Sequence, residues 1–93
     1  DEVDTGGTIV ASAGTLVGRG VKEVYACVTH PVLSRNASDL MAHSNFTEVV
    51  VSDTIPLPVE KRNGKITVLS VAPLLGEAIH RIHKGFSVGE MFN

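Results

Sequence analysis

The chain opens with Asp1-Glu2-Val3-Asp4-Thr5-Gly6-Gly7-Thr8, and the expected fold follows from this stretch. Gly6 and Gly7 allow the backbone to approach a ligand and to turn its N–H groups toward it. The hydroxyls of Thr5 and Thr8 flank these glycines and can donate to phosphate oxygens. An apolar helical pattern follows at once, so the stretch is expected at a helix N-terminus, where the dipole favours an anion. It predicts an anion-binding loop, with a plain tight turn capped by a threonine as the alternative.

Two acidic side chains narrow the kind of ligand that the loop would take. Asp1 and Asp4 do not bind phosphate themselves, but they suit a ligand that also presents hydroxyls or a divalent cation. The loop is not a P-loop, because no Gly-Lys-Ser/Thr follows the glycines. The four histidines do not stand at convincing metal-ligand spacing, and neither a Ser-His-Asp nor a Cys-His arrangement is present. No metal ligand or catalytic residue is therefore predicted in this chain.

Length and composition indicate one small α/β domain or a piece of a larger protein. The 93 residues are 43% hydrophobic, and eight basic against ten acidic residues give a net charge of −2. This balance gives no reason to expect a nucleic-acid or membrane partner. A cytoplasmic location is the expectation, since no signal peptide is seen. Such a loop normally follows a buried strand, which would end just before Asp1, so we expect a C-terminal fragment.

Hydrophobic periodicity predicts alternating helices and strands. A helix is expected over residues 8–19, with an apolar face made of Ile9, Ala13, Leu16 and Val17. A buried parallel strand is expected within 21–29, and Cys27 in it is interpreted as a buried, inert thiol. A short helix is expected over 36–43, with Leu40 and Met41 turned inward.

Two more strands and a last helix complete the pattern. The strands are expected over 48–51 and 66–71. The helix is expected to begin at Pro73, and the residues expected to face the core are Leu75, Ala78, Ile79 and Ile82. Asp53 and Thr54 follow a strand at its carboxyl end, where ligands of open α/β sheets bind. They are either ligand contacts or a turn capped by Asp53. With one strand supplied from upstream, the whole predicts a three-layer α/β unit with a mainly parallel sheet.

The residues that carry a family resemblance occur in blocks along the whole chain. These blocks are Asp4–Thr8, Lys22–His30 with Val32–Ser34, Glu48–Val51 with Asp53–Leu57, Leu69–Ala72, Glu77–Ile79 with Arg81–His83, and Ser87–Val88 with Phe92. In this pattern the chain resembles the C-terminal part of the ribose-phosphate diphosphokinases, also called phosphoribosyl pyrophosphate synthetases. The first block alone would fit many phosphoribosyltransferases, whereas the combination is specific to the synthetases.

The resemblance implies a fold, a reaction and partners. Residues 1–93 would form part of a C-terminal domain of the type I phosphoribosyltransferase kind, beginning inside the ribose 5-phosphate loop and lacking the upstream part and the N-terminal domain. The family transfers the diphosphoryl group of ATP to the anomeric hydroxyl of ribose 5-phosphate, with Mg²⁺. Its members assemble as hexamers of dimers. Their ATP-binding, metal-binding and catalytic elements lie upstream, so the 93-residue chain alone would be inactive.

The resemblance also assigns residues to sites. Asp4, Thr5, Gly6, Gly7 and Thr8 match the loop around the 5-phosphate, and Asp1 matches the second of two acidic residues that hold the ribose hydroxyls. Ser87, Val88 and Phe92 match positions of an allosteric site between subunits. Gly89 stands where relatives often carry a serine, and Arg35-Asn36 replaces a usual Gly-Pro pair. The remaining alternatives are a phosphoribosyltransferase and a non-catalytic, synthetase-associated regulatory subunit.

Overall fold

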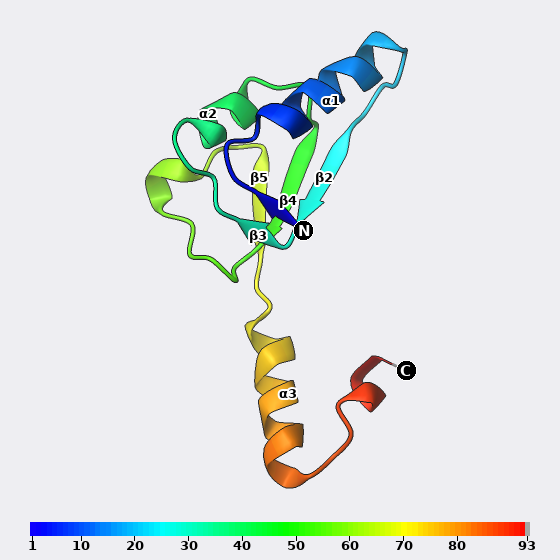
Figure 1. Ribbon diagram of the computed structural model, residues 1–93, viewed down its shortest axis with the longest axis vertical. Helices are drawn as coiled ribbons and strands as arrows, with labels where there is room; N and C mark the ends of the chain where they lie inside the picture. Colours follow the sequence, from blue (N-terminus) through cyan, green and yellow to red (C-terminus); the bar gives the residue numbers. More distant parts are fainter. Residues whose placement is uncertain (93) are drawn as a thin grey trace.

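The computed structural model describes residues 1–92, so Asn93 of the expected domain lies outside the described residues. Strands and helices alternate along the chain (Figure 1). The elements in order are β1 (Glu2–Val3), α1 (Gly7–Gly18), β2 (Tyr25–Val28), β3 (His30–Pro31), α2 (Ala37–Ala42), β4 (Glu48–Ser52), the 3₁₀ turn Val59–Lys61, β5 (Ile66–Leu69), α3 (Ala72–Lys84) and the 3₁₀ turn Gly89–Phe92.

All strand pairs are parallel. The larger sheet has the order β2-β4-β5, with Ala26 opposite Val49 and Val49 opposite Ile66. The shorter strands β1 and β3 form a second pair, with Glu2 opposite His30. Parallel neighbours need crossover connections. Helix α2 lies in the connection from β2 to β4, and the 3₁₀ turn Val59–Lys61 lies in the connection from β4 to β5. The predicted α/β class and the parallel sheet are confirmed.

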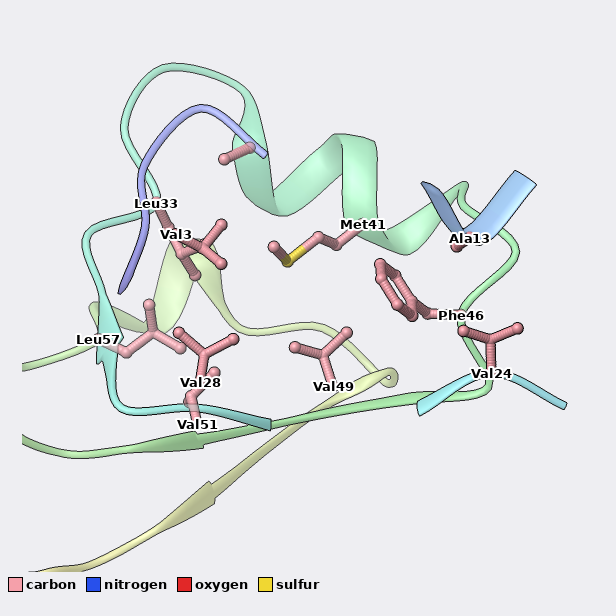
Figure 2. Packing of buried hydrophobic residues seen from close by; sticks show 11 residues of the cluster. Val3, Ala13, Val24, Val28, Leu33, Met41, Phe46, Val49, Val51 and Leu57 are labelled. Atoms are coloured by element: carbon pink, nitrogen blue, oxygen red, sulfur yellow. The ribbon is translucent and has the colours of Figure 1, made fainter. Parts of the chain in front are cut away.

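The core lies between the β2-β4-β5 sheet and the helices α1 and α2 (Figure 2). Along β4 buried residues alternate with half-buried ones, and Val49 and Val51 project into the core. Met41 of α2 lies over them with no exposed surface, beside Phe46 from the loop that follows the helix. These residues form two of the three predicted layers, since helices of the described part cover one face of the sheet.

Several predictions about burial and strand length were wrong. Cys27 is exposed, as is Tyr25, because alternate residues of β2 project from the sheet face that α1 and α2 do not cover. Leu16 and Leu40 are also exposed, because the inward sides of their helices are formed by Ala13 with Val17 and by Met41. The strands over 21–29 and 66–71 are shorter than predicted.

Helix α3 does not pack on the core, contrary to the prediction. It begins with a proline in its first turn and ends at Gly85, whose φ of 75° closes the helix in the left-handed region. No residue of α3 is buried, and Ile79 and Ile82 of its apolar side are 68% and 70% exposed. Figure 1 shows the reason, since the chain continues past the end of β5 instead of folding back over the sheet.

Within residues 1–92, no helix is long and apolar enough to cross a membrane.

Candidate functional site

A pocket of about 210 Å³ lies along the connection from β1 to α1. The residues that line it are Glu2, Val3, Asp4, Thr5, Gly6, Thr8 and Ile9. Four predicted site residues are among them, whereas Asp1 and Gly7 are not. Glu2 and Val3 were expected in the loop but form β1, and their place in the lining was not predicted. The apolar Val3 between acidic neighbours is the signal that indicates a short strand with one buried face.

Gly6 sets the direction in which the chain enters α1. It is the N-cap residue and has a φ of 81°, a conformation that L side chains rarely adopt. A Cβ atom on Gly6 would lie 3.7 Å from the Cβ atom of Ala37 and 3.7 Å from the Cε atom of Met41. These are ordinary contact distances, so the position requires glycine for its backbone angle rather than for space. The loop therefore rests directly on α2.

The segment after β3 holds the loop by backbone hydrogen bonds. The N–H groups of Leu33 and Ser34 donate to the carbonyls of Val3 (3.1 Å) and Asp4 (3.0 Å). The Ser34 hydroxyl also donates to the Asp4 carboxylate. Asp4 therefore stabilises the conformation of the loop through its bond to Ser34, thirty residues further along the chain.

The start of α1 is suited to an anion. No side chain caps the helix by a hydrogen bond, and its first turn contains no acidic residue. The first N–H groups of a helix have no partner within the helix, and the helix dipole places partial positive charge there. The side chains of Thr5 and Thr8 are exposed beside these groups. The pocket thus offers N–H and hydroxyl donors to a negatively charged group.

A second polar group lies at the carboxyl ends of β2 and β4. The Nδ1 atom of His30 lies 2.8 Å from the Oγ1 atom of Thr54. The Thr54 hydroxyl donates to the carbonyl of Thr29 at 3.0 Å, and the Ser52 hydroxyl donates to the same carbonyl. Next to them, the Asp53 carboxylate accepts a hydrogen bond from the N–H of Val71 at 2.8 Å. Asp53 thus joins the end of β4 to the start of α3, rather than capping the turn in which it lies.

The hydrogen bonds that Asp53 accepts predict a pH dependence of stability. Hydrogen bonds from the Ser70 hydroxyl and then from the Val71 N–H lower the pKa of the Asp53 carboxyl below its usual value. A carboxyl group with a lowered pKa in the folded state stabilises the fold above its unfolded pKa, and this stabilisation is lost as the pH falls through the folded pKa. Carboxyl NMR titration should give a pKa below that of an unstructured aspartate. The free energy of unfolding should fall less steeply in acid for Asp53→Asn, and equal slopes for the variant and the wild type would contradict this role.

The predicted allosteric residues lie far from the pocket. Ser87, Val88 and Phe92 belong to the segment after α3, at the opposite end of the molecule from α1 in Figure 1. Arg81 holds this segment against the helix, since its Nη1 atom donates to the Ser87 carbonyl at 3.1 Å and lies 3.5 Å from the Glu90 carboxylate. Ser87 and Phe92 are exposed and Val88 is half-buried. Their allosteric role stays a prediction.

Comparisons with known proteins agree on one family. The family described as "Phosphoribosyl synthetase-associated domain" matches residues 1–93. The chain is 54% identical over 93 residues to the ribose-phosphate pyrophosphokinase of Oceanobacillus iheyensis, covering all of this chain and 29% of that protein. It is 48% identical over 92 residues to the ribose-phosphate pyrophosphokinase of Aquifex aeolicus, covering 99% of this chain and 29% of that protein.

A solved structure shows the same fold. The crystal structure of phosphoribosylpyrophosphate synthetase from Mycobacterium smegmatis superimposes with a TM-score of 0.89 at 40% sequence identity, over 91% of this chain and 28% of that one. The chain spans somewhat less than a third of the length of these relatives. The predicted relationship to the synthetases is confirmed, and the chain belongs to the phosphoribosyl synthetase-associated domain family.

Proposed function

We propose that this chain is the C-terminal segment of a cytoplasmic ribose-phosphate pyrophosphokinase and contributes its ribose 5-phosphate site. That enzyme would transfer the diphosphate of ATP to the anomeric hydroxyl of ribose 5-phosphate and would assemble as a hexamer of dimers. The names of relatives at about 50% identity support the reaction. Because the chain covers 29% of their length, the reaction belongs to the longer protein, and the 93 residues alone are expected to be inactive.

The observation that supports the phosphate site is the uncapped N-terminus of α1, which opens into the pocket beside Thr5 and Thr8. A phosphate group has several acceptor oxygens and a full negative charge, so it can use the helix N–H groups and both hydroxyls together. The left-handed conformation of the buried Gly6 sets the path of the chain into α1, and this path would present the first N–H groups of the helix to the ligand. No acidic side chain in the first turn opposes the charge of the ligand.

The sugar would lie along β1, on the acidic side of the pocket. Asp1 is exposed directly before this strand, and its carboxylate can accept hydrogen bonds from sugar hydroxyls. Asp4 already binds Ser34, so its main contribution would be to the shape of the loop. Holding the unreactive phosphate at one end fixes the anomeric hydroxyl at the other, and this converts binding energy into orientation for the attack on ATP.

Magnesium is the ion that this chemistry requires, because it neutralises the charge of the transferred phosphates. Within residues 1–92, no group of three histidine, cysteine, aspartate or glutamate side chains is placed to hold a metal ion. The residues described do not form a metal centre by themselves. We propose that Mg²⁺ binds mainly to the substrates and to residues outside this chain.

Replacing Thr8 tests the phosphate site. Thr8→Val removes one hydroxyl donor and keeps the side-chain shape, so the affinity for ribose 5-phosphate should fall roughly tenfold to a hundredfold, the range for a hydrogen bond to a charged group. Isothermal titration calorimetry on the protein that contains this chain measures the change. Thr15→Val is the matched control, because Thr15 lies on the same helix and donates to the Ala11 carbonyl. Equal affinities of wild type and Thr8→Val would contradict the phosphate site.

A non-catalytic regulatory subunit is the second candidate, and the description of the matching family as synthetase-associated favours it. A folded protein that neither binds ribose 5-phosphate nor releases AMP from ATP, but alters the activity of a synthetase, would establish this role. The intact phosphate loop argues for the enzyme.

A further inference from the structure

We propose that His30 is a further ligand-binding residue of the same site, and that its Nε2 atom accepts a hydrogen bond from a hydroxyl of the bound sugar. This inference rests on the proposed function, because it assumes that a sugar phosphate occupies the loop. His30 lies outside the loop in sequence, in β3, and its backbone N–H donates to the carbonyl of Asp1 at 2.8 Å.

The strand register places His30 at the edge of the pocket. β1 and β3 are parallel, and Glu2 is the partner of His30 while Val3 is the partner of Pro31. Paired residues of neighbouring strands project from the same face of a sheet, and successive residues alternate between faces. Val3 and Pro31 are buried on the core side, so Glu2 and His30 share the opposite, exposed face. Glu2 lines the pocket, and His30, which does not line it, is the neighbour of Glu2 on this exposed face.

The hydroxyl groups around His30 decide which ring nitrogen carries the proton. A threonine hydroxyl has one proton to donate. Thr54 donates its proton to the carbonyl of Thr29 at 3.0 Å, so its oxygen faces His30 as an acceptor. The Nδ1 atom, 2.8 Å away, is therefore the donor. In the neutral imidazole this leaves a lone pair on Nε2.

Thr54 is accordingly a positioning residue. Its backbone N–H donates to the Ser52 hydroxyl at 3.3 Å, and both hydroxyls converge on the carbonyl at the end of β2. The arrangement joins the carboxyl ends of two neighbouring strands, which is where open α/β sheets bind their ligands. This arrangement would orient the Nε2 atom of His30, as an acceptor, toward the hydroxyls of a bound sugar, next to Asp1. A sugar whose phosphate is bound at the start of α1 would then contact both the His30 imidazole and the Asp1 carboxylate.

Two amide substitutions separate ligand binding from a purely structural role. Asparagine at position 30 places its amide near Nδ1 and can keep the bond to Thr54, whereas glutamine places its amide near Nε2 and can still meet a sugar hydroxyl. We expect His30→Asn and His30→Ala to lower the affinity for ribose 5-phosphate about tenfold, the effect of one hydrogen bond, and His30→Gln to retain most of it. Calorimetry at about pH 8, where an ordinary imidazole is neutral, measures this in the full protein. His83→Gln, at an exposed position on α3, is the control.

Imidazole ¹⁵N spectra provide a second test. If the role of His30 were purely structural, the ligand would leave its Nε2 resonance unchanged. Without ligand the Nε2 resonance of His30 should be that of an unprotonated nitrogen, and ribose 5-phosphate should shift it. The reverse order of the variants, with asparagine active and glutamine inactive, or an unshifted Nε2 resonance in saturated protein, would overturn the inference. If the wild type binds and Thr8→Val does not, but all His30 variants bind normally, only this inference falls. If the wild type does not bind, both proposals fall.

Discussion

Gly6→Val is expected to abolish ribose 5-phosphate binding while leaving most of the fold in place. Gly6 has a φ of 81°, and an L side chain in the left-handed region costs about 1–2 kcal/mol, more when it is β-branched. The chain can relieve this strain by changing the path into α1. The N–H groups of the first helical turn would then no longer point into the pocket. Losing two charge-assisted hydrogen bonds corresponds to a roughly hundredfold or larger decrease in affinity.

Two other glycine variants serve as controls for this experiment. Gly6→Ala carries the backbone strain without a β-branch, and its Cβ atom would meet its neighbours at no less than 3.7 Å, so its binding should be intermediate. Gly18→Ala lies at the other end of α1, has no heavy atom within 4 Å of the added Cβ atom, and should be neutral or stabilising by up to about 1 kcal/mol. Unchanged binding by Gly6→Val would show that the conformation of Gly6 does not matter for the ligand.

Met41→Ala should cause a large loss of stability. The side chain has no exposed surface, and it packs over the sheet beside Phe46 and Val49 (Figure 2). Truncating a fully buried methionine costs about 2–5 kcal/mol, which is a large part of the 5–15 kcal/mol that stabilises a typical domain. Its Cε atom also lies 3.7 Å from the position of a Cβ on Gly6, so the cavity would open below the loop. Ligand affinity should therefore fall together with stability.

Urea unfolding measures this loss, and the neighbouring residue provides the control. Leu40 is 36% exposed, so Leu40→Ala should cost much less than Met41→Ala. Met41→Leu conserves volume and should cost less than about 1.5 kcal/mol. Equal free energies of unfolding for Leu40→Ala and Met41→Ala would show that Met41 is not part of the core.

The parts of the site that could be predicted depend on neighbours in the sequence. Two glycines between threonines, followed by a helical period, are sufficient to predict the turn and the start of α1. Residues that meet across long separations left no comparable signal. Asp4 and Ser34 are thirty positions apart, and His30 and Thr54 are twenty-four. The first contact depends on how β1 and β3 pair, and the second on how β3 lies against β4, which no local pattern specifies.

The fold shows the same division between local pattern and environment. The run of three valines in β4 predicted its strand correctly, and the period of α3 identified its apolar side. Neither pattern says what covers an apolar surface, and for this reason Cys27 and Ile79 were wrongly expected to be buried. A hydrophobic period reports which side of an element avoids water, whereas the packing partner is determined by the remaining chain.

The exposure of α3 has a thermodynamic consequence. A helix of 13 residues without buried side chains lies near the helix–coil limit, below which an isolated segment is mostly unwound in water. Apart from the bond between Asp53 and the N–H of Val71 at its N-cap, what holds it is local, namely the proline in its first turn, the 2.8 Å ion pair between Glu77 and Arg81, and the closing turn at Gly85. Each of these local interactions stabilises only one turn of the helix. We therefore expect α3 in this chain to melt gradually from its ends, separately from the cooperative unfolding of the sheet and its two covering helices.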